Sequence, residues 1–538
     1  MNSKRIPAEL LIVAGAALLF LPFLGSVHLF DWDEINFAEE SREMLITHNY
    51  FVPQINFIAF WEKPPLFFWL QLACMKCFGV NEFAARFPNV VCGMITLLIL
   101  FRLGRKLVNE QFGWTWIFVY VASLLPQMYF RSGIIDPWFN LFIFLSLFHL
   151  ILYSDEKNEY HKKHILLAGF FAGLAMMTKG PVAVLILALC YGVYQISTRF
   201  RNFIKPVDMI LFILLSMVIG GIWFIALLMQ GQGHVILNFF QYQLRLLLTG
   251  DATHGGPFYY HFLVLLIGCV PAAALAILAM VRSRRNPVPV PLNFYRWMMI
   301  LFWVVLLLFS IVRTKIVHYS SLCYIPLTFF AAHAFYTTSK NNRLPSWNRW
   351  LQFLITLVLA LALLMISFLD SFKPWLLRSG IIKDPFAIAS LQARVDWNWT
   401  TTLPGLILLA GSILFIFLSR NNPRRALIAL FCCTLIGFNL ATLLIVPRAE
   451  VYSQNAAIEF YQSKQNEQAL VETLDFFSYA NLFYTRRVPR KEGYTIKGHP
   501  PYPVYFVGKI QNEQADMQLN PRLQKLYEKN GFVFYIQR

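Results

Sequence analysis

The sequence predicts an all-α polytopic membrane protein that carries a small α/β domain at its carboxyl end. Three observations support this fold class. The chain of 538 residues is 57% hydrophobic and only 14% charged, whereas an ordinary soluble chain is about 25% charged. Apolar runs of about 20 residues recur, and each is long enough to cross a bilayer as a helix. After Val446 this apolar character ends.

Thirteen apolar segments are candidate transmembrane helices, because backbone groups in lipid must find their hydrogen bonds within the segment. The first segment follows Lys4 and Arg5, but it is too long for a typical signal peptide and is interpreted as an uncleaved anchor. The thirteen segments lie near residues 8–30, 85–103, 112–130, 137–153, 164–178, 181–198, 207–229, 258–281, 297–312, 318–337, 350–369, 402–419 and 425–446.

The charges between these segments predict their orientation. With the amino terminus inside, all seven inside segments carry Lys or Arg, and acids such as Asp136, Asp251 and Asp370 fall in outside loops. This pattern follows the positive-inside rule, and it accounts for the net charge of +18 without a nucleic-acid partner. The chain then divides into a membrane domain, residues 1–446, and an outside domain, residues 447–538.

The outside domain is expected to be a small α/β unit. The segments GYTI, PVYFVG and FVFYIQR alternate in polarity as strands do. Helices are expected at Ser453–Gln465 and Asn520–Lys529. The unit has about 90 residues, which is near the lower size of a domain.

The first outside loop, from Asp31 to about Arg86, concentrates acidic side chains. Its segments Glu34–Ile46 and Pro65–Leu72 are expected to be two helices lying in the membrane interface. Asp33 immediately precedes the first of them, where Asp is favoured as an N-cap, and the same position places it well over a cavity. The other acids are expected on the solvated face of this helix: Glu39, Glu40 and Glu43.

Ionisable residues also gather at the outside ends of later spans. A charge at a span end can serve as an interface anchor, but a charge at membrane depth is costly and indicates a functional site. Lys and Arg at such a place suit a lipid phosphate. The residues occur in four segments: RSGIIDPWF, MMTKGP, DATHGGPFYYHF and RTKIVHYSSLCYIP.

At these residues the sequence resembles the polyprenyl-phosphate-sugar-dependent glycosyltransferases of the GT-C fold. DWDEINFAEESREML followed by FWEKPP is similar to the first outside loop of the bacterial lipid A aminoarabinose transferases and of the protein O-mannosyltransferases. IIDPWF, MMTKG, HGGPFYY and RTKIVHYSSLCYIP match later segments in the same order. The resemblance covers the whole membrane region.

The resemblance implies a role for each matching residue. Asp33 matches the catalytic aspartate, and Asp136 matches the aspartate of the second outside loop. The donor phosphate would be held by Lys63, Lys179, Arg313, Lys315 and Tyr319. Three further residues complete the site: Glu34, Glu62 and His318. Glu62 with His254 matches the place of a divalent metal, zinc or magnesium, and no organic cofactor is implied.

The implied reaction moves a sugar from a polyprenyl (undecaprenyl) phosphate to a lipid, such as lipid A, another envelope glycan or a protein. Basic residues would stabilise the leaving phosphate, and Asp33 would act as general base in an inverting displacement. The implied location is the bacterial inner membrane among its lipids, with many spans, a cytoplasmic amino terminus and a periplasmic carboxyl-terminal domain.

Three positions depart from the aminoarabinose transferases. Asn36 and Phe37 stand where those enzymes carry Arg-Tyr, and Phe60 stands where they carry Tyr. These differences leave the sugar and the acceptor open.

Two alternative functions fit the sequence less well. A transporter or flippase of polyprenyl-linked lipids would place its charges near the midplane, often in paired repeats, whereas here they gather at one face and no repeat is evident. A scaffold protein with a membrane anchor would not need thirteen spans.

Overall fold

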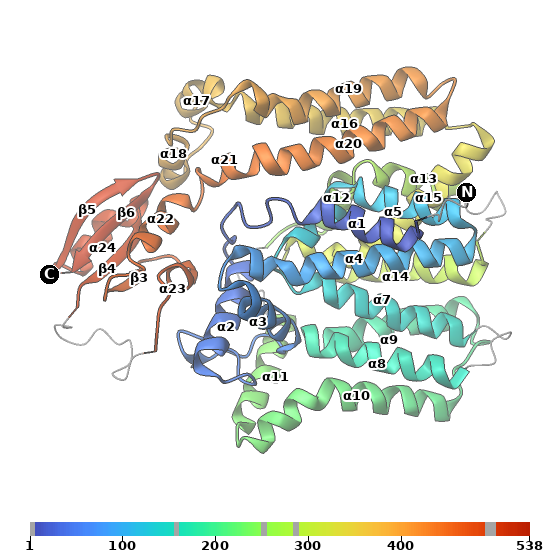
Figure 1. Ribbon diagram of the computed structural model, residues 1–538, viewed down its shortest axis with the longest axis horizontal. Helices are drawn as coiled ribbons and strands as arrows, with labels where there is room; N and C mark the ends of the chain where they lie inside the picture. The colour runs from blue at the N-terminus through green and yellow to red at the C-terminus, as the bar shows by residue number, and fades with distance from the viewer. Residues whose placement is uncertain (1–5, 155–160, 249–254, 283–289, 490–501, 538) are drawn as a thin grey trace.

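The computed structural model describes all residues except 1–5, 155–160, 249–254, 283–289, 490–501 and 538. Two regions follow each other along the chain, a large bundle of helices and a smaller region built on a β-sheet (Figure 1). The long helices of the bundle lie side by side, and the sheet region lies beyond one end of them, next to the helices of the first loop (Figure 1).

The bundle contains one or two helices for each predicted span. Neighbours in it pack pairwise, for example α7 on α8, α8 on α10, and α19 on α20. The bundle helices are α1 (Ala8–Phe20), α4 (Glu82–Leu107), α5 (Glu110–Val121), α7 (Asp136–Tyr153), α8 (His161–Lys179), α9 (Val182–Ser197), α10 (Pro206–Met229), α12 (Tyr260–Gly268), α13 (Ala272–Arg282), α14 (Leu292–Ile311), α15 (Tyr324–Asn341), α16 (Ser346–Ser367), α19 (Leu403–Leu418) and α20 (Pro423–Leu444).

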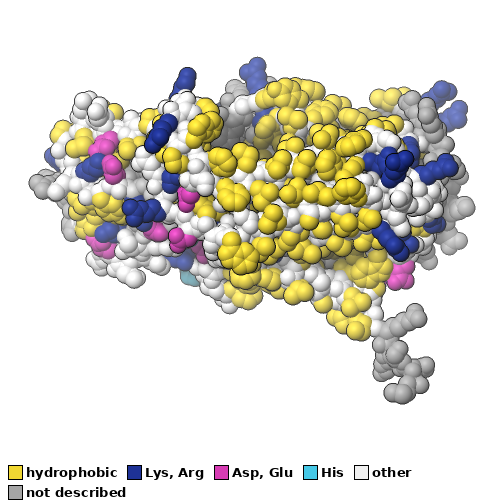
Figure 2. Space-filling view, turned by 90° about the horizontal axis from the view of Figure 1, so that it is seen from above, with side chains coloured by type: hydrophobic (Ala, Val, Ile, Leu, Met, Phe, Trp, Pro, Cys, Tyr) yellow, Lys and Arg dark blue, Asp and Glu magenta, His cyan; other side chains and the backbone are white. Residues whose placement is uncertain are grey.

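The exact number of thirteen spans is not confirmed. Seven helices of the described residues are long and apolar enough to cross a membrane, and α12 with α13, bent by 111°, is an eighth candidate. Each predicted segment contains at least one helix, but α1 and α9 are shorter apolar helices. Figure 2 shows a broad band of hydrophobic side chains over the bundle, with Lys and Arg on either side of the band, including a group at the end away from the sheet.

Shorter elements lie at the end of the bundle that faces the sheet region. The two interfacial helices predicted in the first loop are present as α2 (Asp33–Thr47) and α3 (Leu66–Phe78), and a small hairpin joins them. The hairpin strands are β1 (Gln54–Ile55) and β2 (Ile58–Ala59). The remaining elements between the spans are α6 (Leu124–Met128), η1 (Tyr129–Arg131), α11 (Gly233–Leu248), η2 (Val317–Cys323), α17 (Leu369–Arg378), α18 (Pro385–Leu391), η3 (Trp399–Thr402) and α21 (Val446–Glu450).

The sheet region is an α/β unit with strand order β3-β4-β6-β5, in which β3 pairs parallel to β4 and the other pairs are antiparallel. Its strands are β3 (Leu470–Thr473), β4 (Val504–Lys509), β5 (Leu523–Lys529) and β6 (Phe532–Gln537). Its helices are α22 (Asn455–Ser463), α23 (Ala480–Tyr484), η4 (Ile510–Asn512) and α24 (Glu513–Leu519).

Three of the predicted segments in this region are present as expected, and one prediction was wrong. PVYFVG contains β4, FVFYIQR contains β6, and α22 falls within Ser453–Gln465. The predicted helix Asn520–Lys529 is instead strand β5. Asn530 and Gly531 both have positive φ and connect β5 to β6, and Asn-Gly is a strong hairpin signal. The segment GYTI lies outside the described residues.

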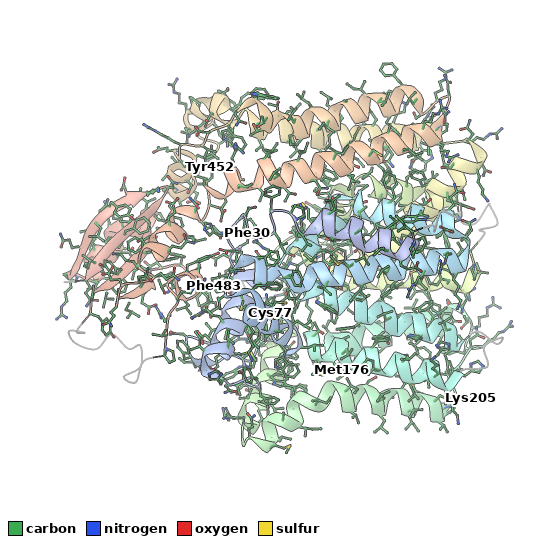
Figure 3. The ribbon with its side chains drawn as sticks, in the orientation of Figure 1. Phe30, Cys77, Met176, Lys205, Tyr452 and Phe483 are labelled. Atoms are coloured by element: carbon green, nitrogen blue, oxygen red, sulfur yellow. The ribbon has the colours of Figure 1, made fainter. Side chains whose placement is uncertain are left out.

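The sheet region packs on the first loop through a shared apolar core. One cluster of buried side chains joins Ile35 of α2 and Met75 of α3 to Phe483 and Tyr484 of α23. Figure 3 labels Phe483 on the side of the sheet region that faces α2 and α3. Because this core is continuous, the carboxyl-terminal region holds α2 in place at the end of the bundle.

Candidate active site

Helix α2 begins at Asp33, which is therefore the first helical residue instead of the expected N-cap. Trp32 occupies the cap position with a positive φ of 73°, and no side chain there caps the helix. Positive φ is unusual for a residue with a large side chain and is typical of constrained sites. Asp33 and Glu34 place negative charge in the first turn, where the helix dipole favours it. The turn leaves the Asp33 carboxylate facing other elements.

Asp33 is the first member of a chain of four ionisable side chains. His318 Nε2 lies 2.8 Å from an Asp33 carboxylate oxygen and 3.7 Å from an oxygen of Asp136. Lys179 Nζ donates a hydrogen bond of 2.6 Å to the other oxygen of Asp136. The sequence predicted each of these four residues for the site, and the structure brings all four together.

Four separate elements bring these side chains together. Asp136 is the first residue of α7, whose next residue is Pro137, a position that proline suits. Lys179 is the last residue of α8, and Gly180 with φ of 78° turns the chain immediately afterwards. His318 belongs to η2, which follows α14. The four side chains therefore meet where three helix ends converge.

The charges around Asp33 keep it ionised. Burial by itself would raise the pKa of this carboxyl, but the hydrogen bond and charge of His318, followed by the charges of Lys63 and Lys179, lower its pKa to about 2. Asp33 is therefore a carboxylate at neutral pH, which is the form that can accept a proton.

A cavity of about 290 Å³ adjoins this chain. Its polar wall includes three of the five residues predicted to hold phosphate, Lys63, Lys179 and Tyr319. Lys179 Nζ also lies 4.9 Å from the centre of the Tyr319 ring. The rest of the wall is mainly apolar, for example Leu185 of α9, Leu308 and Phe309 of α14, and Val312 immediately after α14. A cavity that combines ammonium groups with hydrocarbon walls suits an amphiphilic anion.

The other two predicted phosphate ligands lie apart from this cavity wall. Lys315 is buried, and its Nζ donates to the backbone carbonyls of Phe309, Ser310 and Val312 at 3.1, 2.6 and 2.5 Å. It thereby satisfies carbonyl groups at the end of α14, which otherwise lack partners. Arg313 is exposed.

Glu34 has a buried partner in the fold. The guanidinium of Arg86 binds its two carboxylate oxygens at 2.8 Å each, and the backbone N–H groups of Gly133 and Phe30 donate to it as well. These bonds join α2, α4 and the loop before α7. Glu34 therefore lies where it can hold α2 beside Asp136.

The prediction that Glu39, Glu40 and Glu43 form a solvated face was wrong, since all three are fully buried. Glu39 pairs with Arg42 through two hydrogen bonds of 2.6 and 2.7 Å. Glu43 accepts the backbone N–H groups of the hairpin turn, Asn56 and Phe57, at 2.7 and 2.6 Å. The hairpin and the carboxyl-terminal region cover the face that would otherwise meet solvent.

Glu62 lies beside Lys63 in the loop that precedes α3, and its carbonyl accepts a hydrogen bond of 2.9 Å from Gln243 of α11. His254, its predicted partner for a metal, lies outside the described residues. Within the described ranges no three His, Cys, Asp or Glu residues come together as a metal-binding group. Gln243 also lines the cavity. The sequence did not indicate Gln243, because α11 lies between the predicted spans.

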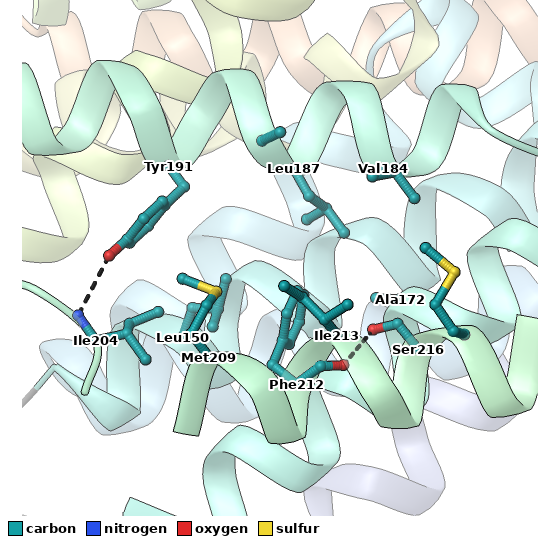
Figure 4. A pocket seen from close by; sticks show the side chains of 12 residues that line it. Leu150, Ala172, Val184, Leu187, Tyr191, Ile204, Met209, Phe212, Ile213 and Ser216 are labelled. Atoms are coloured by element: carbon teal, nitrogen blue, oxygen red, sulfur yellow. Dashed lines mark hydrogen bonds between the residues drawn. The ribbon is translucent and has the colours of Figure 1, made fainter. Parts of the chain in front are cut away.

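A second cavity, of about 310 Å³, lies between α7, α8, α9 and α10 (Figure 4). Its lining is almost entirely apolar, for example Leu187, Met209 and Phe212, and it contains no acidic or basic side chain. The hydroxyl groups at its edge are already engaged, since Tyr191 accepts from the Ile204 N–H and Ser216 donates to the Phe212 carbonyl (Figure 4). This cavity suits hydrocarbon.

Comparison with known proteins agrees with this geometry. Residues 62–223 match the family of dolichyl-phosphate-mannose-protein mannosyltransferases. An undecaprenyl phosphate-alpha-4-amino-4-deoxy-L-arabinose arabinosyl transferase of Photorhabdus laumondii is 27% identical over 347 residues, which cover 63% of this chain and 61% of that protein. The enzyme of the same name from Enterobacter sp. is 26% identical over 464 residues, 84% of this chain and 78% of that protein.

Solved structures extend the likeness to the whole fold. The crystal structure of ArnT from Cupriavidus metallidurans in the apo state matches with a TM-score of 0.76 at 17% identity, over 98% of this chain and 97% of that one. The same protein bound to undecaprenyl phosphate matches with a TM-score of 0.75 at 16% identity, over the same shares of both chains.

These likenesses define a class: the chain has the fold of ArnT, and its sequence is similar to glycosyltransferases whose names include dolichyl or undecaprenyl phosphate. Within this class it is similar to the aminoarabinose transferases, both in sequence and in fold.

Proposed function

We propose that this protein is a glycosyltransferase that moves a sugar from a polyprenyl phosphate, such as undecaprenyl phosphate, to an acceptor outside the cytoplasm. The observation that carries the proposal is the chain Asp33–His318–Asp136–Lys179 beside a cavity with ammonium groups and hydrocarbon walls. A buried carboxylate and a cavity suited to a lipid phosphate therefore adjoin each other, which supports sugar transfer from a lipid phosphate.

The proposed reaction is a single displacement. Asp33 takes the proton of an acceptor hydroxyl while the hydroxyl oxygen forms a bond to the anomeric carbon of the sugar. The bond from that carbon to the phosphate oxygen breaks, and the electron pair leaves with the polyprenyl phosphate. Lys63 and Lys179 stabilise the charge on this leaving group. Attack opposite the leaving group inverts the anomeric carbon.

The same proposal includes a position for the phosphate. A lipid phosphate at Lys63 and Lys179 would leave its polyprenyl chain against the apolar residues of α9 and α14 that line the cavity. Lys179 would then contact both the phosphate and Asp136. Asp136 and His318 act as positioning residues, because they fix Lys179 and Asp33 relative to each other.

We propose only the class of acceptor: a lipid, a glycan or a protein that carries a hydroxyl or phosphate group. Asn36, Phe37 and Phe60 replace an arginine and two tyrosines that the aminoarabinose transferases carry. These replacements change groups near the site, so we do not assign the sugar and acceptor of those enzymes to this chain.

The divalent metal stays a proposal. Glu62 would supply one oxygen ligand near Lys63, and His254 would have to supply a second ligand. A metal held there would add positive charge beside the leaving phosphate. The other residues of the site do not depend on it.

We propose the bacterial inner membrane as the location, with the amino terminus in the cytoplasm and the sheet region in the periplasm. The clustering of Lys and Arg at the end of the bundle away from the sheet supports this orientation (Figure 2), since such residues favour the cytoplasmic side.

Asp33→Asn tests the reaction directly. The amide cannot accept the proton, so we expect transfer of radiolabelled sugar from undecaprenyl phosphate to envelope acceptors to fall by about 10²–10⁴-fold. Purified protein in lipid vesicles would be assayed for covalent product. Asp31→Asn is the matched control, because Asp31 is exposed and its carboxylate accepts a hydrogen bond from Ser478. Full transfer by Asp33→Asn would remove Asp33 as the base.

The same assay separates transfer from transport. If the wild-type protein moves labelled lipid across the vesicle membrane without forming a covalent product, the chain is a flippase and the proposed transfer is wrong.

A further inference from the structure

The loop between α9 and α10, residues 198–205, concentrates positive charge at the end of the bundle away from the sheet region. It carries Arg199, Arg201 and Lys205 and no acid, and all three basic side chains are exposed. Figure 3 labels Lys205 at this end. Within the described ranges none of the three forms an ion pair. The loop therefore presents three cations that an external anion can reach.

Two exposed aromatic rings lie among these cations. Phe200 and Phe203 are 58% and 62% exposed, and their rings stack on each other with centres 5.9 Å apart. Arg199 and Phe200 are consecutive residues with positive φ, 54° and 59°, which is uncommon for large side chains and persists only where the surroundings hold it. Apolar side chains beside Arg and Lys are typical of a segment that contacts the membrane interface.

Side chains of α9 hold this loop in place. The Gln195 carbonyl accepts the N–H of Phe200 at 2.8 Å, and its side chain donates to the carbonyl of Asn202 at 2.9 Å. The N–H of Ile204 donates to the Tyr191 hydroxyl at 3.2 Å (Figure 4). The loop therefore presents its cations and rings from a backbone that α9 fixes.

The apolar cavity of about 310 Å³ begins directly at this loop. Ile204 of the loop and Tyr191 of α9 lie together at one end of it (Figure 4). Its wall continues along α9 as far as Val184, about 10 Å from Tyr191 along the helix axis. Ile213 and Met217 of α10 also line it, and both are exposed. The cavity therefore opens on the apolar surface of the bundle.

We propose that loop 198–205 and this cavity form a binding site for one anionic phospholipid, of the type of phosphatidylglycerol. The lipid phosphate would contact Arg199, Arg201 and Lys205, and one acyl chain would occupy the cavity that starts at Ile204. A basic loop alone attracts any anion, and an apolar cavity alone accepts any hydrocarbon. The two adjoin here, which is the arrangement that a charged headgroup with an attached acyl chain requires.

Helix α9 connects this site to the cavity proposed to hold the donor phosphate. Val182 and Leu185 line the donor cavity, whereas Leu187 and Tyr191, on another face of the same helix, line the proposed lipid site. A bound phospholipid would thus support α9 from behind the donor cavity. We expect it to raise the rate of sugar transfer. This consequence rests on the proposed function, whereas binding of the phospholipid does not.

Native mass spectrometry of the purified protein tests the binding. The protein in detergent would be titrated with phosphatidylglycerol and with phosphatidylcholine of the same acyl chains, which differ in net charge. We expect tighter binding of phosphatidylglycerol. The loop variant, Arg199→Gln with Arg201→Gln and Lys205→Gln, should bind it about 10–100-fold more weakly, because each cation near an anionic lipid contributes to the attraction.

A matched variant removes three other basic side chains, by Arg420→Gln, Arg424→Gln and Arg425→Gln. They are exposed around the turn between α19 and α20 and line neither cavity. This variant should retain the preference for phosphatidylglycerol.

Ala188→Trp tests the acyl-chain part of the site, because Ala188 is an exposed residue of the cavity wall. The larger side chain should fill the cavity and weaken binding while the three cations remain. Thermal unfolding in detergent identifies folding defects, and Arg201→Gln alone replaces the loop variant if that variant does not fold.

Transfer of labelled sugar in lipid vesicles tests the effect on activity. Wild-type protein should be several-fold faster in vesicles of phosphatidylcholine with phosphatidylglycerol than in phosphatidylcholine alone, and the loop variant should be equally fast in both. Equal wild-type rates, with selective binding intact, would remove the coupling through α9. Selective binding without transfer in either vesicle would contradict the proposed function and leave the lipid site supported.

Three outcomes would overturn the lipid site. Equal affinity for the two phospholipids means that charge is not recognised. An equal loss of affinity in the loop variant and in the Arg420, Arg424 and Arg425 variant means that the cations act only as a diffuse surface charge. Displacement of phosphatidylglycerol by a lower concentration of undecaprenyl phosphate means that the occupant is a polyprenyl phosphate instead of a phospholipid.

Discussion

The low pKa of Asp33 determines when it can act as a base. A carboxylate with a pKa of about 2 is ionised at neutral pH but binds a proton weakly. It can take the proton of a hydroxyl only when that proton has become acidic, which happens as the oxygen bonds to the anomeric carbon. We therefore expect proton transfer to follow bond formation to the sugar instead of preceding it.

His318→Gln should change the pH dependence of transfer. His318 makes the largest contribution to lowering the pKa of Asp33, in opposition to burial, which is the largest influence overall. Without His318 the pKa of Asp33 rises, so Asp33 becomes protonated at a higher pH. The acid limb of the kcat profile should move upward by about one pH unit or more, and the variant should lose activity on acidification before the wild type does.

The control for this experiment is His48→Gln, because His48 is exposed at the end of α2 and contacts Tyr50. Its pH profile should match that of the wild type. If His318→Gln lowers kcat equally at every pH, His318 positions the reacting groups without setting the pKa of Asp33.

Residues of the site differ in how far the sequence could predict them. Asp33, Asp136, Lys179 and His318 lie at outside ends of predicted spans, so topology alone places them on one face, and the family resemblance predicts their roles. Their mutual distances depend on how three helix ends pack. The carbonyl groups that Lys315 binds are likewise set by the local path of the chain after α14, which no spacing of residues indicates.

At the scale of elements, α2 shows why a local pattern misled the sequence interpretation. Its polar side chains form a face that would be solvated on an isolated interfacial helix. In the fold the sheet region covers this face. For example, Arg42 donates a hydrogen bond to the backbone carbonyl of Arg487, 445 residues later. The sheet region and the hairpin thus bury a helix face that would otherwise be exposed to solvent. A pattern within fifteen residues cannot contain this information.

Arg42→Met should destabilise the protein strongly. Arg42 and Glu39 form a buried ion pair with exposed fractions of 1% and 0%. Removing Arg42 leaves the Glu39 carboxylate buried without its cation, which costs about 3–5 kcal/mol. The expected result is a clear decrease in the apparent Tm measured by unfolding in detergent, together with greater proteolysis of the carboxyl-terminal region.

The double variant Glu39→Met with Arg42→Met provides the comparison. Replacing both members of a buried ion pair by apolar side chains is often neutral, so the double variant should recover much of the lost stability. An Arg42→Met protein as stable as the wild type, or a double variant less stable than the single one, would contradict the role assigned to the pair.

At the scale of the whole molecule, the two ends of the bundle differ in chemistry. One end carries the site, the first loop and the sheet region, where Asp and Glu lie among Lys and Arg, and the other carries a group of Lys and Arg side chains (Figure 2). The sequence could predict this polarity from the loops alone, since charge bias between loops is independent of packing. It could not predict the bend of 111° between α12 and α13, which makes one apolar segment into two helices.

Cysteine labelling in intact spheroplasts tests the orientation of the whole chain. Glu528→Cys lies in the sheet region, and Asn421→Cys lies in the turn between α19 and α20, beside Arg420; both positions are exposed. Each would be made in a Cys77→Ala background, because Cys77 is an exposed native cysteine. A membrane-impermeant maleimide should label Glu528→Cys at once and label Asn421→Cys only after the membrane is permeabilised.

The physical reason is that basic turns such as the one between α19 and α20 remain on the cytoplasmic side during insertion. The donor phosphate and the acceptor would then meet on the opposite side, at the end of the bundle that α2 and the sheet region cover. The reverse labelling pattern would place the site in the cytoplasm. It would contradict the proposed periplasmic acceptor, while the contacts among Asp33, His318 and Asp136 would still support the proposed chemistry.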